Sequence, residues 1–447
     1  MDHAGKNNSD SWQSAATLQC VAAFCLLQRK FRELWFPVPL EMSMKTYLKT
    51  NCSFTRNCLL SGLRFVTAPL LTCLAALFIS VTTPAVASGP SANPDAPTST
   101  FVTSAPKAPP QVRYMLIELG GRTAFDISQS GQIVGNKQFA PGLRHAAFWP
   151  CSRSAAIDLG TLPGLNSVAR SINSRREIVG VAFNEDFSVE RPLFWASPNS
   201  TPVELPGLPA GLAGEVYDIN PSGQIVGQFF NADFSVNPAV FWPNSNAAPI
   251  YLHVLSNKLF ASVATSINAS GNILGDACDQ AGVECHAVFW ANSTSTPVAL
   301  ASPGGGFIYS FVVFYSHGIN GAGNMVGYAY TPGFAAVRAV LWASSSSPAV
   351  VLSTVSEFTN TVAAGISDNG QIVGYGFNDD FSRSRAYIWP SATSQAIDLT
   401  TFFPAGSNWD LDSTYAIAVN NRGEIIGGGF FKDGTEHNFV LIPVHGH

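Results

Sequence analysis

Two aspartates suggest the most specific chemistry in this 447-residue chain. Asp126 and Asp218 each precede an isoleucine, in segments that resemble one another. A pair of carboxylates can cleave a glycosidic bond when the two groups lie roughly 5 to 9.5 Å apart. Similar segments elsewhere carry Ser, Gly or Ala at this position, and the two segments with aspartate are not consecutive. We therefore keep Asp126 and Asp218 only as an alternative catalytic pair.

Two irregular segments, residues 301–316 and 400–415, are rich in aromatic rings, and in the second these lie beside carboxylates. This combination suits the binding of sugar rings or of a protein partner. The candidate binding residues are Phe307, Tyr309, Phe314 and Tyr315 in the first segment, and Phe402, Phe403, Trp409, Asp410 and Asp412 in the second. The alternative interpretation is that these aromatic side chains pack the segments onto the fold.

Three short loops share the motif Phe-Asn-x-Asp-Phe-Ser, at residues 183–188, 230–235 and 377–382. Asn and Asp are favoured in tight turns, so the motif predicts hairpin loops. A more specific hypothesis is that the aspartates present oxygens to a glycan or to Ca²⁺; they are Asp186, Asp233 and Asp380. Their wide spacing argues against one shared ion. The sequence has no zinc-ligand pattern and no phosphate-binding glycine loop, so we expect no metal and no cofactor.

All these residues lie within a repeat whose clearest copy covers residues 217–227. It reads Tyr-Asp-Ile-Asn-Pro-Ser-Gly-Gln-Ile-Val-Gly, and an Ala-Val-Phe-Trp segment follows it. The closing glycine recurs at seven positions that lie 45 to 53 residues apart: Gly135, Gly180, Gly227, Gly275, Gly327, Gly374 and Gly427. A period of about 45 to 50 residues is the length of a four-stranded propeller blade.

Turns and tryptophans divide each repeat into strands. An Asn-x-x-Gly turn or a close relative separates the first strand from the second, because Asn and Gly tolerate the left-handed backbone of a hairpin. The third strand carries a tryptophan in six units: Trp149, Trp195, Trp242, Trp290, Trp342 and Trp389. Because a buried indole removes a large apolar area from water, we expect these rings to pack between blades.

The two ends of the repeat region complement each other. The last unit stops after its third strand, whereas residues 114–121 resemble a fourth strand but precede the first unit. An N-terminal strand that completes the last blade would close the ring and cover a sheet edge. The predicted fold class is therefore all-β, a seven-bladed β-propeller with four strands per blade, closed by an N-terminal strand.

The order of these motifs resembles the HAF-repeat family of predicted extracellular bacterial proteins. The best His-Ala-x-Phe-Trp copies cover residues 145–149 and 286–290, and an Asp-Leu-Gly-Thr-Leu-Pro-Gly motif covers residues 158–164. The resemblance extends over about residues 111–444. It implies a secreted, propeller-like repeat protein, and it implies no catalytic residues.

The N-terminal region has the pattern of a secretory signal within residues 42–87. Basic residues precede the apolar run 65–81, and Ala-Val-Ala at 85–87 suits a signal peptidase. An uncleaved membrane anchor is the alternative. Residues 1–41 match no targeting pattern, and we interpret them as an over-extended N-terminus. Residues 88–111 are rich in Pro, Ser and Ala and predict a disordered linker before the propeller at 112–447.

Charge and cysteines narrow the class of partner. Removing residues 1–87 leaves 16 basic and 25 acidic residues, which argues against nucleic acid or anionic membrane as a partner. Cys278 and Cys285 flank a predicted hairpin tip, where cross-strand neighbours come close enough for a disulfide in an oxidising compartment. Two free thiols are the alternative.

Variation between units points to one face of the predicted disc. The interval from glycine to tryptophan hardly changes, whereas the interval to the next unit varies, and loops of variable length on one face mark a binding face. We expect a secreted, extracellular or periplasmic monomer without a membrane span, which binds polysaccharide or an extracellular protein through this face. The alternative is a propeller-type glycan-active hydrolase or lyase that uses carboxylates in the channel.

Overall fold

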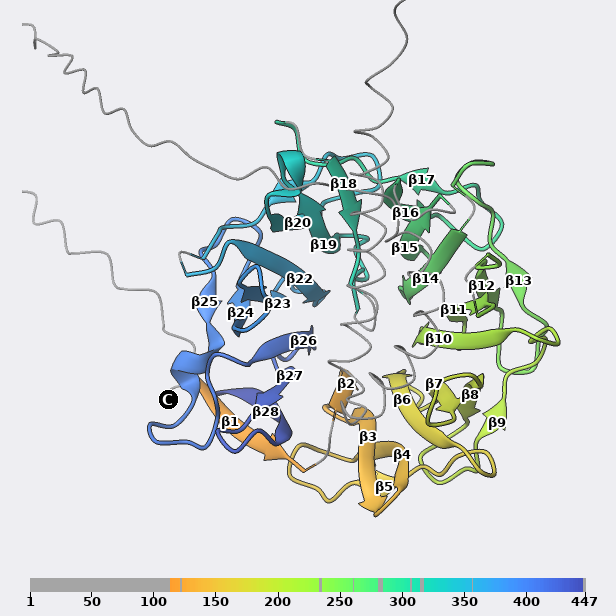
Figure 1. Ribbon diagram of the computed structural model, residues 1–447, viewed down its shortest axis with the longest axis horizontal. Helices are drawn as coiled ribbons and strands as arrows, with labels where there is room; N and C mark the ends of the chain where they lie inside the picture. Colours follow the sequence, from red (N-terminus) through yellow and green to blue (C-terminus); the bar gives the residue numbers. More distant parts are fainter. Residues whose placement is uncertain are drawn as a thin grey trace, which may run out of the picture. The chain divides into compact units, whose positions relative to one another are not determined.

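The computed structural model describes residues 113–444 apart from a few short gaps. The gaps are residues 121–122, 233–234, 260, 280–283, 306–307, 314–316 and 356. The segments predicted at 1–41, 42–87 and 88–111 lie outside the described residues. The described part forms seven four-stranded antiparallel sheets arranged around one axis (Figure 1). The predicted seven-bladed β-propeller is therefore confirmed.

The strands of blades 1 to 6 follow the chain from the axis outward, whereas the outermost strand of blade 7 comes from the N-terminal end of the described chain (Figure 1). Blades 1 to 3 contain β2 (Thr123–Ile127), β3 (Ile133–Ala140), β4 (Leu143–Trp149) and β5 (Ile157–Asp158); β6 (Asn166–Ile172), β7 (Ile178–Phe183), β8 (Glu190–Trp195) and β9 (Val203–Glu204); and β10 (Ala213–Ile219), β11 (Ile225–Phe230), β12 (Ala239–Trp242) and β13 (Ile250–Tyr251). Blade 4 contains β14 (Ala261–Ile267), β15 (Ile273–Cys278), β16 (Cys285–Trp290) and β17 (Val298–Ala299).

Blades 5 to 7 add two short 3-10 helices to the same plan. Blade 5 contains β18 (Ile308–Phe311), β19 (Met325–Tyr330), η1 (Pro332–Phe334), β20 (Val337–Trp342) and β21 (Val350–Val351). Blade 6 contains β22 (Asn360–Ile366), β23 (Ile372–Phe377), β24 (Ser384–Trp389) and β25 (Ile397–Asp398), and η2 (Leu399–Phe402) follows it. Blade 7 contains β26 (Tyr415–Val419), β27 (Ile425–Phe430), β28 (Glu436–Val444) and β1 (Arg113–Leu119).

The antiparallel order gives the propeller two distinct faces. The turns from first to second strand lie on one face, which we call the turn face. The connections from second to third strand and from one blade to the next lie on the opposite face, which we call the loop face. A connection between two blades that is longer than usual therefore adds residues to the loop face.

Asparagine side chains join neighbouring blades along the turn face. The Asn220 side chain accepts hydrogen bonds from the backbone N–H of Ser222 and Gln224, and its amide donates to the Asn268 carbonyl of the next blade at 3.0 Å. The same bond between blades is made by Asn173, Asn268, Asn320 and Asn420. One side chain thus closes its own turn and fixes the position of the next blade.

The six tryptophans of the third strands are fully buried between blades. The indole N–H of Trp195 donates to the carbonyl of Leu159 in the preceding blade at 2.7 Å. The equivalent bonds lead from Trp242, Trp290, Trp342 and Trp389 to the preceding blade. Burial of each ring with its polar N–H satisfied stabilises the contact between blades, as the sequence predicted.

The closing glycine of the repeat lies against a bulge in the first strand. The register of β10 and β11 shifts between Val216 and Asp218. A Cβ added to Gly227 would lie 2.1 Å from the Glu215 carbonyl oxygen, which no side chain tolerates. The glycine is therefore required by the close approach of two strands, and the bulge turns the residue after it toward the axis of the ring.

The N-terminal strand completes blade 7, as predicted. β1 pairs with β28 over seven residue pairs, from Arg113 with Val444 to Leu119 with Asn438. The fourth strands of the other blades make only two such pairs each. Tyr114 and Leu116 of β1 pack onto the hydrophobic core of blade 7. The ring is thus closed by hydrogen bonds and apolar packing between the two ends of the chain.

Candidate functional site

The segment between blades 6 and 7, residues 399–414, departs most from the repeat among the described segments, and we call it the blade 6–7 insertion. A bridge pair joins Ser413 to Ser384 of blade 6, and another joins Trp409 to Phe431 of blade 7. Backbone pairing on both sides therefore holds the insertion against the loop face.

Trp409 of the insertion belongs to the hydrophobic core of blade 7. The third strand of this blade carries Leu441 where the other blades carry tryptophan, and both Leu441 and Trp409 are buried in this core. Its fully buried ring lies 5.4 Å from Phe403 and 5.6 Å from Phe439. The buried Phe403 and the partly buried Phe402 belong to the same core. The alternative interpretation from the sequence fits these three aromatic residues, and they form no exposed ligand surface.

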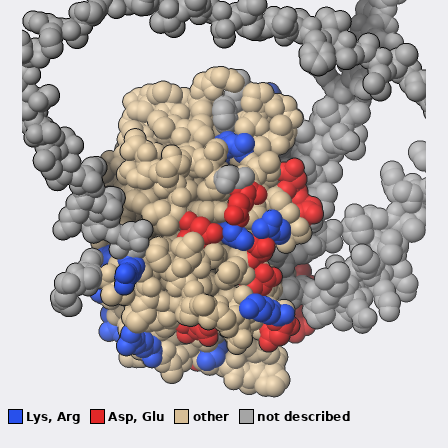
Figure 2. Space-filling view, turned by 90° about the vertical axis from the view of Figure 1, so that its left-hand side faces the viewer, with Lys and Arg blue, Asp and Glu red and all other residues tan. Residues whose placement is uncertain are grey.

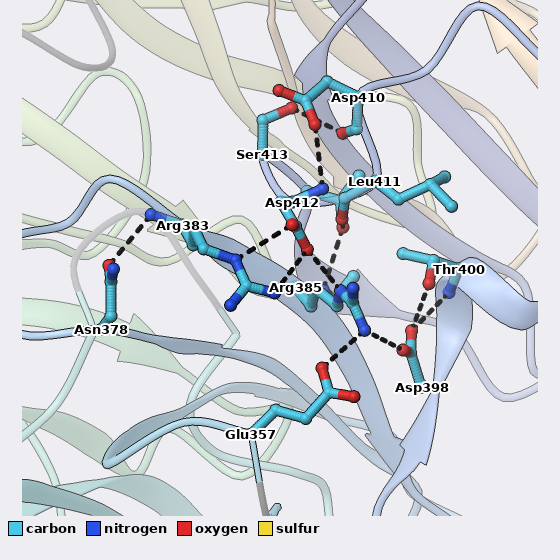
Figure 3. Close-up of polar contacts among 12 residues, drawn as sticks. Glu357, Asn378, Arg383, Arg385, Asp398, Thr400, Asp410, Leu411, Asp412 and Ser413 are labelled. Atoms are coloured by element: carbon cyan, nitrogen blue, oxygen red, sulfur yellow. Dashed lines mark hydrogen bonds and ion pairs between the residues drawn. The ribbon is translucent and has the colours of Figure 1, made fainter.

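An ion-pair network fastens the tip of the insertion to blade 6 (Figure 3). Asp412 accepts hydrogen bonds from Arg383 at 3.0 and 3.1 Å and from Arg385 at 2.7 Å. On its other side, Arg385 contacts Glu357 at 2.6 Å and Asp398 at 3.3 Å. The hydrogen bond from Arg383, reinforced by Arg385, lowers the pKa of the Asp412 carboxyl. The network therefore stays charged at neutral pH.

The network leaves the tip of the insertion open to solvent. Asp410 is exposed, and one of its oxygens accepts the backbone N–H of Asp412 at 3.1 Å. Leu411, between them, keeps 39% of its surface exposed. Figure 2 views the molecule from the side on which β1 and β25 lie in Figure 1, and acidic and basic side chains gather there amid uncharged surface. The insertion thus presents an apolar side chain within a rigid charged frame.

The Asp residues of the Phe-Asn-x-Asp-Phe-Ser loops form turns. Asp186 and Asp380 are exposed, and each accepts the backbone N–H of the serine two residues later at 3.0 Å. Asp233 lies outside the described residues. The turn-forming role expected of the motif is therefore present at Asp186 and Asp380.

The phenylalanine after each of these aspartates has a strained backbone. Phe187 and Phe381 both have φ of 57°, and Phe334 in the corresponding loop of blade 5 has φ of 58°. A bulky side chain rarely adopts this left-handed conformation, which costs about 1 to 3 kcal/mol. Nothing in the sequence marks this strain except the place of the residue in the turn.

The predicted binding residues of segment 301–316 are only partly described. Tyr309 lies within β18, whereas Phe307, Phe314 and Tyr315 lie outside the described residues. Their proposed contact with a ligand stays a prediction.

Asp126 and Asp218 come together through a histidine that the sequence did not single out. His317 of blade 5 places Nε2 2.8 Å from Asp126 and Nδ1 3.4 Å from Asp218. Blades 1, 3 and 5 are not neighbours in the ring, so these side chains meet near the axis. Partial burial by itself lowers the pKa of His317, but the two carboxylates outweigh it and raise this pKa well above its usual range.

The two aspartates also hold neighbouring first strands. Asp126 accepts the backbone N–H of Ile172 in blade 2 at 2.8 Å. Asp218 accepts the N–H of Ile267 in blade 4 at 2.8 Å and the hydroxyl of Ser171 in blade 2 at 2.8 Å. Both carboxylates are almost fully buried. These bonds to neighbouring strands suit a structural role for both side chains.

Cys278 and Cys285 form a disulfide at the end of the hairpin in blade 4, with an S–S distance of 2.04 Å. Their Cα atoms are cross-strand partners in β15 and β16. The pairing expected from the sequence is therefore present.

No group of metal-ligating side chains able to hold an ion occurs among the described residues. Within the same part of the chain, no helix has the length and apolar character needed to cross a membrane.

Comparison with known proteins gives no family. No family model matches the chain, and no curated protein matches it. Among solved structures, the chain is similar to an oligogalacturonate lyase in complex with manganese, with 9% identity, a TM-score of 0.48, and coverage of 74% of this chain and 97% of that one. It is also similar to YCF48 bound to D1 peptide, with 11% identity, a TM-score of 0.39, and coverage of 74% and 97%.

A third similar structure is TolB from Acinetobacter baumannii, with 9% identity and a TM-score of 0.37. This match covers 71% of the chain and spans 64% of the TolB structure. With identities of 9 to 11% and TM-scores below 0.5, these similarities assign no function to the chain.

Proposed function

We propose that the protein is a non-catalytic binding module that recognises a polysaccharide or an extracellular protein through the loop face. The observation that carries this proposal is the blade 6–7 insertion. Trp409 anchors it in the core, Asp412 ties it to two arginines, and Leu411 at its tip is left exposed. A loop held this rigidly loses little conformational entropy when it binds a partner.

The carboxylates near the axis favour binding over catalysis. Every oxygen of Asp126 and Asp218 already contacts His317, a backbone N–H or a serine hydroxyl. A glycosidase needs one carboxyl group with a raised pKa as the acid. Asp126 and Asp218 remain the basis of the rival proposal, a glycan-active hydrolase or lyase.

We further propose that the protein is exported and acts outside the cell or in the periplasm, as a member of the HAF-repeat family. The signal pattern within residues 42–87 and the disulfide between Cys278 and Cys285 support export. N-terminal sequencing of the exported protein tests this directly. A protein retained in the cytoplasm with an intact N-terminus contradicts it.

An array of polysaccharides and extracellular proteins tests the binding function. We expect Leu411→Asp to weaken binding at least about tenfold, because it places a charge in the apolar contact. Val350→Asp is the matched control, since Val350 is also exposed, on the outer strand β21. Equal binding by Leu411→Asp and the native protein contradicts the role of the insertion.

Product analysis separates the two functions. A binding module releases no product from any polysaccharide that it binds. Turnover that survives Leu411→Asp and is lost in a folded Asp218→Asn variant would instead establish the enzyme.

A further inference from the structure

Three hairpin loops on the loop face end in paired aromatic rings. In blade 2 the ring of Phe187 stacks on Phe183, with centroids 4.9 Å apart and planes at 10°. In blade 6 the ring of Phe381 stacks on Phe377, at 4.7 Å and 14°. In each pair the second strand supplies the inner ring and the turn supplies the outer ring.

Blade 5 reaches a similar arrangement with a different sequence. Phe334 follows Thr331-Pro-Gly instead of the Asn-x-Asp motif, yet its ring lies 5.3 Å from Tyr330 at the end of β19. Its backbone N–H donates to the Thr331 carbonyl, as that of Phe381 donates to Asn378. Two unrelated loop sequences therefore place a phenylalanine at the same point of the turn.

The backbone of this turn does not call for a phenylalanine. Blade 7 has Gly434 at the corresponding point, with φ of 81° and an N–H donated to the Phe431 carbonyl at 2.9 Å. Glycine and asparagine adopt this conformation without strain, whereas phenylalanine does not. The repeated presence of an aromatic ring at a strained position is better explained by contact with a ligand than by the needs of the hairpin.

The surroundings of the outer rings suit sugars. Phe334 keeps 45% of its surface exposed. Phe187 and Phe381 are each preceded by an exposed aspartate, Asp186 and Asp380. A sugar ring offers an apolar C–H face that stacks on an aromatic ring and hydroxyl groups that bond to neighbouring carboxylates. The loops thus combine the two kinds of contact that a carbohydrate requires.

We propose that Phe187, Phe334 and Phe381 are stacking platforms for the sugar rings of a neutral polysaccharide that lies across the loop face. Platforms on blades 2, 5 and 6 are reached together by a long chain and not by a single sugar. The net charge of -5 disfavours a polyanion. This proposal rests on the binding function proposed above and names its ligand class. In blade 3 the sequence repeats the motif with Phe234, which lies outside the described residues.

The test is affinity electrophoresis of the full chain in native gels that contain hydroxyethylcellulose, galactomannan or xyloglucan. We expect at least one of these polymers to retard the native protein. The triple variant Phe187→Asn, Phe334→Asn and Phe381→Asn should bind that polymer at least about tenfold more weakly, because the platforms are lost. Its thermal unfolding temperature should be unchanged or higher, because asparagine tolerates the left-handed backbone.

A second triple variant keeps the test valid if the first one folds poorly. Tryptophan at the same three positions retains a stacking surface, so we expect retardation equal to or greater than that of the native protein. Retention of binding by the asparagine variant, or loss of binding by a folded tryptophan variant, overturns the proposal.

Failure of this inference is distinguishable from failure of the binding function. Suppose that Leu411→Asp abolishes retardation while the asparagine variant is retarded normally. The stacking role of the three phenylalanines is then wrong, and binding through the loop face is supported. If none of the three polymers retards the native protein, the proposal that the ligand is a neutral polysaccharide is wrong. A protein partner found on the array would then still support the binding function.

Discussion

The two faces of the propeller use similar residues for opposite purposes. On the turn face, Asn220 closes a turn and bonds to the next blade, and four other asparagines repeat this contact. On the loop face, Asn231 also closes a turn, and its amide bonds to Ser235 within the same loop. The difference teaches that the turn face repeats one contact between blades, whereas the contacts between blades on the loop face, among them those of Arg144 with Asn166 and of Val337 with Asn360, differ from blade to blade.

Removal of β1 should cause the largest loss of stability, and it tests whether the blades form one cooperative ring. Deleting residues 112–119 exposes the core around Leu116 and Leu119 and breaks the seven residue pairs with β28. We expect a loss of roughly 4 to 6 kcal/mol, since each buried large apolar side chain contributes about 1.5 to 3 kcal/mol. Denaturant unfolding measures it. A peptide of residues 112–119 added in trans should restore part of the loss, and unchanged stability would contradict closure by β1.

A matched pair of asparagine variants should lose less stability, and it compares the two faces directly. Asn220→Ala leaves a buried carbonyl and two backbone N–H groups without their partner, so we expect a loss of about 2 to 3 kcal/mol. Asn231→Ala affects one loop only and should cost less than about 1 kcal/mol. Chemical denaturation of both variants checks the difference. Equal losses would show that the two faces contribute alike.

Raising the pH should cause the smallest loss of stability, at the contact between blades near the axis. The pKa of His317 is raised in the folded state by Asp126 and Asp218. Its contribution to stability is therefore complete below the unfolded pKa of about 6.5 and is lost as pH rises through the raised folded value. Thermal unfolding from pH 6 to pH 10 should show this decline in the native protein and a flatter profile in His317→Gln. Identical profiles would show that the charge of His317 does not stabilise the fold.

The repeat made the architecture predictable. Seven copies of the closing glycine, the tryptophans and the unmatched ends were sufficient for seven blades and for closure by residues near 114, because these features follow from turn chemistry and burial. The bulge was not predictable, because Gly227 served only to mark the period of the repeat. The glycine is required by a backbone contact between strands that no residue type announces.

The candidate site was predictable only in its location. Variation in sequence length pointed to the two long loops, residues 301–316 and 400–415, and the second of them is the insertion before blade 7. The contacts of the residues in this insertion were not predictable. Trp409 was expected to contact a ligand because it lies in a long loop beside carboxylates, yet its side chain is buried in the core of blade 7. Arg383, Arg385 and His317 were missed, since their partners are distant in sequence and only the folded chain brings them together.

The length of β1 has a consequence for how the chain could be rearranged. Seven residue pairs hold the two ends together in blade 7, whereas two pairs suffice for β13, which a covalent connection attaches to β12. In a circular permutant with its termini moved to that connection, ring closure would depend on the pairing of the short β13 with β12. Such a permutant would need β13 lengthened before its ring could close as firmly as the natural one.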